Sequence, residues 1–302
     1  MTEPTEVIKT ESEAGVMSRF ADFVELTKPR LTLLSVMTTL AGYYLGARGS
    51  VEVMPLVHAL IGTFLVGGGC GAVNMYMEST LDGLMKRTAA RPIPAKRITP
   101  FEALVTGIVM TIAGIVWLTL MNNLLAGLLA AATFVSYVFL YTPLKRRSTL
   151  NTIVGGIPGA LPPVIGWAAA SGEIGPGAFA LFALLFFWQM PHFLALAWMY
   201  RKDYARAGYR MLPVLDPDGA ATSRQILLYT AALLPVSLIP TLVGISGPVY
   251  FFGAVILGGT FLWLGFRFAV GRKNSQAKWV FHFSLAYLPI LLLVMAIDGP
   301  SF

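Results

Sequence analysis

The sequence predicts an all-α membrane protein, folded as a polytopic bundle of nine transmembrane helices with its N-terminus in the cytoplasm. The first observation is the composition, because 56% of the 302 residues are hydrophobic and only 12% are charged, whereas about a quarter of the residues in a soluble domain are charged. The second is that the apolar residues form runs of about 20, the length that a helix needs to cross a bilayer. The third is that the basic residues fall in alternate connections between these runs.

The nine apolar runs follow one another with short polar connections. They cover about residues 29–47, 53–75, 101–120, 123–141, 151–170, 176–199, 225–245, 248–267 and 279–297. The third and fourth runs are the hardest to separate, because only Asn122 and Asn123 mark the turn, so eight or seven spans remain alternatives. The fifth run holds Gly155-Gly156 and Pro162-Pro163, which predict either a kinked helix that lines a cavity or tight helix packing.

The basic residues predict the orientation. All 22 Lys and Arg residues except Arg48 lie on one side of the expected topology. Cytoplasmic loops are enriched in basic residues, so this side faces the cytoplasm and the C-terminus lies outside. The net charge of +7 is therefore a topology signal, and we expect no nucleic-acid partner.

The N-terminal residues 1–20 form a polar arm with neither the apolar core of a signal peptide nor the acid-poor character of a transit peptide. We expect a disordered arm over 1–20 and a single membrane domain over 21–302. A multi-pass protein of the bacterial inner (plasma) membrane, with its polar loops in the cytoplasm, fits these features best.

A candidate metal site lies where the second apolar run ends. Asn74, Glu78 and Asp82 recur at every fourth residue and therefore share one slowly drifting face of a helix. Two carboxylates and a carboxamide make an oxygen-only site, which suits Mg²⁺ bound together with substrate phosphates. A basic segment follows directly, with Lys86, Arg87, Arg91, Lys96 and Arg97. Acids beside a basic loop at the edge of a membrane bundle indicate a lipid diphosphate substrate.

A second polar cluster follows the sixth run. Tyr200, Asp203 and Tyr204 share a helical face, so Asp203 is a candidate for the same metal–diphosphate site, with the tyrosines as hydrogen-bond donors. An ordinary membrane-flanking segment with interfacial tyrosines is the alternative. Asp82 and Asp203 each precede a proline by ten residues, which suggests that spans 1–4 and 5–8 are two related halves.

Two further segments carry candidate residues. Lys145 and Arg146 end the fourth run and suit phosphate oxygens, although basic membrane anchors are an equal alternative. His192 lies inside the sixth run, where an ionisable residue normally faces the bundle interior. A hydrogen-bonded interior histidine and a haem-iron ligand are its two interpretations.

The chain resembles the protohaem IX farnesyltransferases, a family of the UbiA superfamily of intramembrane prenyltransferases. The resemblance covers residues 26 to about 214 and rests on short motifs that occur in order. These are Leu26-Thr27-Lys28-Pro29-Arg30, Asn74-x3-Glu78-x3-Asp82 with Arg87-Thr88 and Arg91-Pro92, Tyr141-Thr142-x-Leu144-Lys145-Arg146, Gly155-Gly156 to Pro162-Pro163, Trp188-Gln189-Met190-Pro191-His192-Phe193, and Asp203-Tyr204 with Met211-Leu212-Pro213.

Two motifs depart from the superfamily pattern. The first motif more often has Asp where this chain has Glu78. The second motif is commonly a pair of Asp four residues apart, and this chain has Tyr200 and Tyr204 there, with Asp203 between them. We therefore assign most of the metal ligation to the first motif.

The resemblance implies transfer of a farnesyl group from farnesyl diphosphate to a vinyl group of haem B. The product, haem O, is destined for haem-copper terminal oxidases, with a downstream haem-oxidising enzyme as a further candidate partner. Mg²⁺ is the implied cofactor and the lipid bilayer the surroundings, and the faces of Tyr76 and Tyr200 are candidates to stabilise the allylic cation. The implied substrate-binding residues are Lys28, Arg30, Arg87, Arg91, Lys145, Arg146 and His192.

Two other functions remain alternatives at this point. The first is the same enzyme class with another aromatic acceptor, such as 4-hydroxybenzoate, a quinone precursor or a chlorophyll-type ring. The second is a secondary transporter with acids along an ion path, which the two related halves would allow. The clustering of the acids at one membrane face, beside basic residues, favours the enzyme.

Overall fold

A computed structural model describes residues 19–299, and this part of the chain is helical and contains no strand. The predicted arm lies outside the described residues, apart from Arg19 and Phe20, which are helical together with the residues that follow as far as Leu26. The remaining elements are α2 (Pro29–Gly46), α3 (Val53–Asp82), α4 (Pro100–Met121), α5 (Leu124–Val135), the π-helix η1 (Ser136–Tyr141), α6 (Thr142–Leu144), α7 (Asn151–Ala160), α8 (Pro162–Ser171), α9 (Pro176–Met199), α10 (Arg201–Arg206), α11 (Leu212–Leu215), α12 (Ala220–Val236), α13 (Ile239–Leu242), α14 (Pro248–Gly271) and α15 (Asn274–Ile297).

The all-α class is confirmed, and the helices follow the predicted apolar runs closely. Eight helical segments of the described part are long and apolar enough to cross a bilayer. The first predicted span, α2, is not among these eight helices, so the count of nine stays a prediction. The helix α3 continues seven residues past the predicted end and so carries the first polar motif on a helix, as its four-residue spacing predicted. The seventh predicted span is interrupted, because α12 ends at Val236 and α13 follows as a separate short helix.

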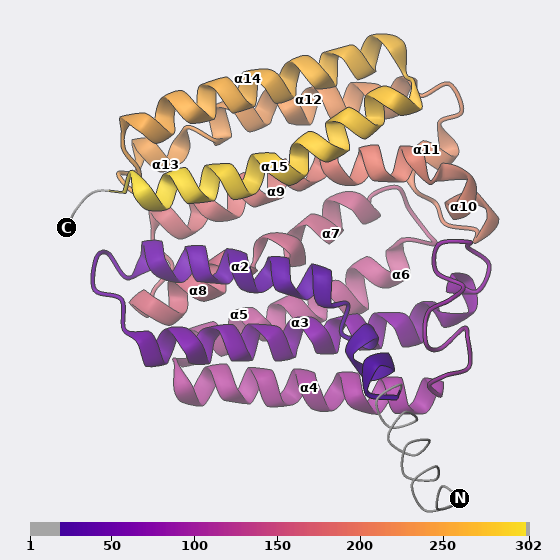
Figure 1. The fold of residues 1–302 in the computed structure, drawn as a ribbon, viewed down its shortest axis with the longest axis horizontal. Coiled ribbons are helices and arrows are strands. Elements are labelled where there is room, and N and C mark those ends of the chain that lie inside the picture. Colours follow the sequence, from indigo (N-terminus) through magenta and orange to yellow (C-terminus); the bar gives the residue numbers. More distant parts are fainter. Residues whose placement is uncertain (1–18, 300–302) are drawn as a thin grey trace, which may run out of the picture.

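The connections between the helices lie at the two ends of the bundle (Figure 1). The long basic segment between α3 and α4, the connection from α6 to α7, and α10 with α11 all lie at one end. The connection between α2 and α3, which carries Arg48, lies at the other end. The arrangement agrees with the predicted alternation of basic connections, while the orientation in a membrane stays a prediction.

The fifth predicted span is a broken helix. It ends as α7 at Ala160 and resumes as α8 at Pro162, because two consecutive prolines lack the N–H groups that would continue the ladder. Its second half packs very closely against α2. A Cβ atom on Gly42 would lie 2.0 Å from the carbonyl oxygen of Pro163, and one on Gly166 would lie 2.0 Å from the carbonyl oxygen of Thr39. The segment therefore has both predicted properties, the kink and the tight packing.

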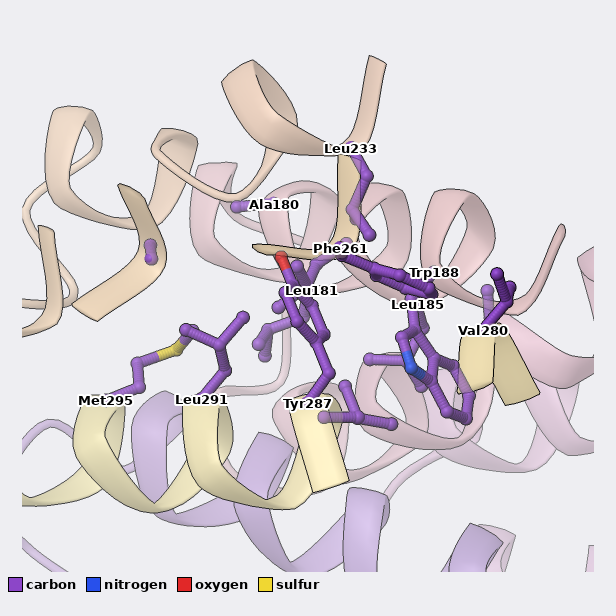
Figure 2. Close-up of a cluster of buried hydrophobic side chains, with 14 of the residues drawn as sticks. Ala180, Leu181, Leu185, Trp188, Leu233, Phe261, Val280, Tyr287, Leu291 and Met295 are labelled. Atoms are coloured by element: carbon purple, nitrogen blue, oxygen red, sulfur yellow. The ribbon is translucent and has the colours of Figure 1, made fainter. Parts of the chain in front are cut away.

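The second half of the bundle has its own apolar core (Figure 2). Large buried side chains from α9, α12, α14 and α15 meet there, among them Trp188, Phe261 and Tyr287. Trp188 also donates its indole N–H to the carbonyl oxygen of Ser284 at 2.8 Å. This core fixes α9 against α15 and so positions the face of α9 that carries His192.

Candidate active site

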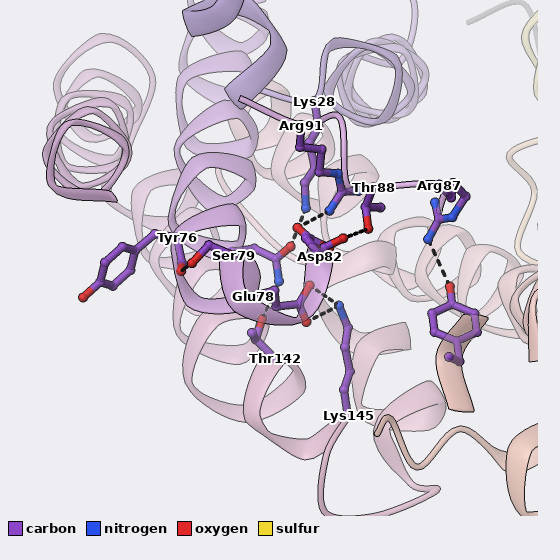
Figure 3. A network of polar contacts seen from close by, with 12 residues as sticks. Lys28, Tyr76, Glu78, Ser79, Asp82, Arg87, Thr88, Arg91, Thr142 and Lys145 are labelled. Atoms are coloured by element: carbon purple, nitrogen blue, oxygen red, sulfur yellow. Dashed lines mark hydrogen bonds and ion pairs between the residues drawn. The ribbon is translucent and has the colours of Figure 1, made fainter. Parts of the chain in front are cut away.

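The last two turns of α3 carry the first polar motif on a buried face. Asn74, Glu78 and Asp82 are 0%, 5% and 1% exposed, respectively. Figure 3 shows Glu78 and Asp82 pointing toward basic residues of other segments, and Asn74 bonds to Lys28 and Thr142, which belong to two of these segments. Tyr76 points away from this cluster, so its predicted role in stabilising an allylic cation has no support in the structure.

Each of the three motif residues is paired with a different basic side chain. Lys28 donates from Nζ to Asn74 Oδ1, and Arg91 donates to Asp82 Oδ2 at 2.7 Å. Lys145 donates from Nζ to both carboxylate oxygens of Glu78, at 2.8 and 3.0 Å. These partners come from the turn before α2, from the α3–α4 connection and from the end of α6. The structure therefore brings together four separate segments that the sequence had marked one by one.

The surroundings of Lys28 and Lys145 shift the pKa values of these two lysines in opposite directions. Burial, together with the nearby charge of Arg91, lowers the pKa of Lys28 to about 7. Burial also opposes the charge on Lys145, but the adjacent Glu78 carboxylate outweighs this effect and raises the pKa of Lys145 well above its usual value. Lys145 is therefore a permanent cation at this site, whereas Lys28 has the weaker hold on its proton.

The oxygen atoms at this site fit a magnesium ion. Within residues 19–299, Asp82 Oδ1 is buried and has no hydrogen-bond partner, so one carboxylate oxygen has an unused lone pair at the centre of the cluster. Two carboxylates and an amide oxygen are hard donors of the kind that Mg²⁺ prefers. No group of three or more His, Cys, Asp or Glu side chains comes together in the described residues, so a magnesium ion held here would need further oxygen ligands, such as phosphate oxygens or water.

The second polar cluster meets the basic connection through Arg87. Its guanidinium donates to the hydroxyl of Tyr204 at 3.4 Å and lies 5.3 Å from the ring centre of Tyr200. Asp203 forms an ion pair with Arg206, at 3.2 Å on the same short helix. The two tyrosines therefore face the α3–α4 connection, while the carboxylate of Asp203 is engaged locally.

A largely apolar cavity of about 230 Å³ begins at the polar cluster and runs into the bundle. Lys28 belongs both to its lining and to the cluster around Asn74. Its other polar lining residues include Tyr137, Tyr141, Gln189 and His192, which come from η1 and α9. The cavity thus suits a substrate with an apolar body and a polar head.

His192 is held in the cavity wall with a defined orientation. Its ring stacks on that of Phe281, with centres 4.8 Å apart. Its Nδ1 lies 2.7 Å from the hydroxyl oxygen of Ser284, and that hydroxyl donates its own hydrogen to the carbonyl oxygen of Phe281. The tautomer that carries its hydrogen on Nδ1 satisfies both contacts together, because the Ser284 hydroxyl has only one hydrogen to donate. The second nitrogen, Nε2, is then the one with a free lone pair.

Two predicted substrate residues lie apart from this cavity. Arg146 lines a separate pocket of about 190 Å³ on another side of Glu78, together with Arg147 and Tyr209. Arg30 is exposed on α2 and does not line either pocket. The adjacent Lys145 and Lys28 are the basic residues of these two motifs that reach the central cluster.

Four residues of the site were missed by reasoning from the sequence. Tyr137 and Tyr141 line the cavity, and their four-residue spacing was an available signal. Thr142 bonds to Asn74, but it was noted only as part of a motif. Tyr209 is buried next to Lys145, and burial together with the charge of Glu78 raises the pKa of Tyr209, so its hydroxyl stays protonated. Nothing in the sequence around Tyr209 marked this position.

Comparison with known proteins gives consistent matches over most of the chain. A model of the UbiA prenyltransferase family matches residues 35–288. A protoheme IX farnesyltransferase of Solibacter usitatus (strain Ellin6076) is 47% identical, over 93% of this chain and 99% of that protein. Proteins of the same name from Koribacter versatilis (strain Ellin345) and Aquifex aeolicus (strain VF5) are 44% and 42% identical, over 94% and 95% of this chain and 95% and 97% of their own lengths.

Solved structures share the fold at low identity. A structure described as digeranylgeranylglyceryl phosphate synthase in membranes has a TM-score of 0.78 at 16% identity, over 93% of this chain and 98% of that one. A UbiA homologue from Archaeoglobus fulgidus bound to DMAPP and Mg²⁺ has a TM-score of 0.64 at 14% identity, over 91% and 99% of the two chains. These likenesses show a common arrangement of helices.

Proposed function

Because the chain belongs to the UbiA prenyltransferase family, we propose that this enzyme transfers the farnesyl group of farnesyl diphosphate to a vinyl group of haem B and so makes haem O. The high identity to several protoheme IX farnesyltransferases supports the choice of donor and acceptor. The observation that carries the proposal is the continuity of the polar cluster with the apolar cavity through Lys28. A diphosphate at the cluster has its isoprenoid chain in the cavity.

The α3 motif is the proposed magnesium site of this reaction. Asn74, Glu78 and Asp82 would hold the ion through their oxygen atoms, and the unused Asp82 Oδ1 supports this assignment. When bound, Mg²⁺ neutralises part of the diphosphate charge and makes the diphosphate a better leaving group. The solved relative from Archaeoglobus fulgidus, which holds Mg²⁺ with DMAPP, supports a divalent cation in this fold.

The three paired cations have a second role in this proposal. Arg91 and Lys145 now neutralise the carboxylates of Asp82 and Glu78, and Lys28 donates to the neutral amide of Asn74. Cations at this place bind phosphate oxygens and stabilise the negative charge that grows on them as the C–O bond breaks. Because the cluster is buried, these interactions act with little screening by water.

The cavity is the proposed place of the carbon–carbon bond formation. The C–O bond of farnesyl diphosphate breaks, a vinyl carbon of haem bonds to the farnesyl carbon, and water adds to the remaining carbocation with loss of a proton. Tyr137 and Tyr141 present aromatic rings in the cavity lining and would stabilise the allylic cation. The apolar walls would keep water away until the new bond has formed.

His192 is the proposed haem contact. Its Nδ1 is in hydrogen-bond contact with the Ser284 hydroxyl, and the second ring nitrogen of a metal-bound histidine usually has such a hydrogen-bond partner, which fixes the orientation of the ring. We expect His192→Ala to weaken the Soret band and the haem affinity of the purified protein, because the Nε2 ligand is lost. Ser284→Ala, which removes only the orienting hydroxyl, gives a smaller change in a haem titration. A Soret band and affinity unchanged in His192→Ala would remove this residue as a ligand.

The proposed setting is a bacterial inner membrane with the motif end of the bundle in the cytoplasm. The gathering of basic connections at this end supports this orientation (Figure 1). Farnesyl diphosphate would then be collected at the cytoplasmic face, and haem O would pass to terminal oxidases or to a haem-oxidising enzyme.

The reaction itself is the direct test of the proposed function. Purified protein in mild detergent is incubated with haem B, farnesyl diphosphate and Mg²⁺, and the haem is examined by chromatography and mass spectrometry. We expect a haem heavier by one farnesyl group plus one hydroxyl group, formed only with the divalent cation. Prenylation of another aromatic acceptor, with haem unchanged, would contradict the acceptor, and no prenylation of any acceptor would contradict the enzyme.

A further inference from the structure

Thr142 lies at the junction between the π-helix and α6, in contact with α3. It is 4% exposed, and its backbone N–H bonds to the carbonyl oxygen of Tyr137, five residues earlier. The hydroxyl of Thr142 donates to the same carbonyl oxygen at 2.9 Å. The wider turn of a π-helix shifts the register of the residues that follow it. This register directs the side chain of Thr142 toward the start of the α3 motif.

The Thr142 hydroxyl determines which way the amide of Asn74 faces. The hydroxyl hydrogen is already used by Tyr137, so toward α3 the oxygen of Thr142 can only accept a hydrogen bond. Asn74 Nδ2 donates to it at 3.0 Å. The oxygen of that amide, Oδ1, must therefore face the opposite side, where Lys28 donates to it. Both contacts agree on one of the two possible orientations of the amide.

We propose that Thr142 is a positioning residue, which keeps Asn74 Oδ1 turned toward the cation site. This inference rests on the proposed function, since it concerns how the same site is prepared. A flipped amide would present its NH₂ group, which has no lone pair for a metal ion. Lys28 also holds the amide oxygen, but in the proposed reaction it is needed at the diphosphate. Thr142 bonds to the amide nitrogen rather than to the oxygen, so its contact can persist while the oxygen holds a cation.

The same short segment also holds the second motif residue. Lys145, three residues after Thr142, reaches Glu78, so α6 supports Asn74 and Glu78 together. Residues that orient metal ligands usually affect metal affinity by about 10-fold to 100-fold when they are replaced. Replacing Thr142 is therefore expected to weaken the affinity for the cation and to leave the affinity for haem unchanged.

The test compares two variants of the full-length protein. Thr142→Val keeps the shape of the side chain but removes the hydroxyl, and Thr142→Ser keeps the hydroxyl. Binding of Mn²⁺ in the presence of inorganic diphosphate is followed by the electron paramagnetic resonance signal of free Mn²⁺, and the Mg²⁺ dependence of transfer is measured in parallel. We expect about 10-fold weaker Mn²⁺ binding in Thr142→Val, near-normal binding in Thr142→Ser, and an unchanged KM for haem.

The control and the contrary outcomes separate this inference from the proposed function. Thr260→Val removes an exposed hydroxyl that bonds only to its own helix, and it should bind Mn²⁺ as the wild type does. Normal Mn²⁺ binding in Thr142→Val, or a loss in Thr142→Ser as large as that in Thr142→Val, would overturn the positioning role alone. A wild type that binds no Mn²⁺ with diphosphate would overturn the proposed metal site and, with it, this inference.

Discussion

Replacing Asp82 with asparagine is expected to lower farnesyl transfer by more than about 100-fold, the usual size of the loss when one preorganised charge contact to a transition state is removed. The substitution keeps the size of the side chain but removes a buried negative charge and the free carboxylate oxygen. It should also weaken Mn²⁺ binding in the presence of inorganic diphosphate. Transfer and Mn²⁺ binding are measured on protein that elutes as a single species in detergent, and near-normal activity would contradict the metal role.

Two matched variants distinguish metal binding from loop anchoring. Asp82 also pairs with Arg91, so a loss caused only by the freed α3–α4 connection would be reproduced by Arg91→Ala. Because Arg91 is a proposed diphosphate ligand, we expect Arg91→Ala to slow transfer but to weaken Mn²⁺ binding much less than Asp82→Asn does. Glu173→Gln, an exposed acid at the other end of the bundle, should leave both quantities unchanged.

Replacing Gly42 with alanine is expected to destabilise the fold by about 3 kcal/mol, the upper end of the usual cost of overpacking. The added Cβ would lie 2.0 Å from the carbonyl oxygen of Pro163. That oxygen belongs to the backbone and cannot move aside without separating α2 from α8. Because residues of both helices line the cavity, the loss of stability is expected to be accompanied by a loss of transfer.

The measurement is the midpoint of thermal unfolding of the purified protein in detergent. Gly253→Ala is the matched control, because a Cβ atom at that glycine on α14 meets open space. It should unfold at the wild-type temperature. Equal midpoints for the wild type and Gly42→Ala would mean that α2 and α8 do not approach each other as closely as the structure has them.

The helices and their limits could be read from the sequence because a membrane span is a local property. A run of about 20 apolar residues is sufficient to predict a helix, since only a helix satisfies all of its backbone hydrogen bonds within one segment in lipid. The spacing of Asn74, Glu78 and Asp82 was equally local, and it predicted their common face on α3. The kink of the fifth span followed from Pro162 and Pro163 for the same reason.

The side-chain contacts of the site join residues that are far apart in the sequence. Lys28 bonds to a residue 46 positions away, and Lys145 to one 67 positions away. No pattern in the sequence assigns each cation to its partner, because the partner depends on how the helices cross. The same holds for Arg146, which chemistry alone made as good a candidate as Lys145, but which lines a separate pocket.

The sequence by itself therefore determined the membrane class, the helices, the polar motifs and the family resemblance. Only the tertiary structure decided that the motifs meet, that the cluster opens into an apolar cavity through Lys28, and that Asp203 is engaged by Arg206. The tertiary structure also decided that the π-helix brings Thr142 to Asn74. The physical reason is that apolar length and helical periodicity act within a segment, whereas hydrogen-bond partners, cavities and changes of register depend on how segments pack against one another.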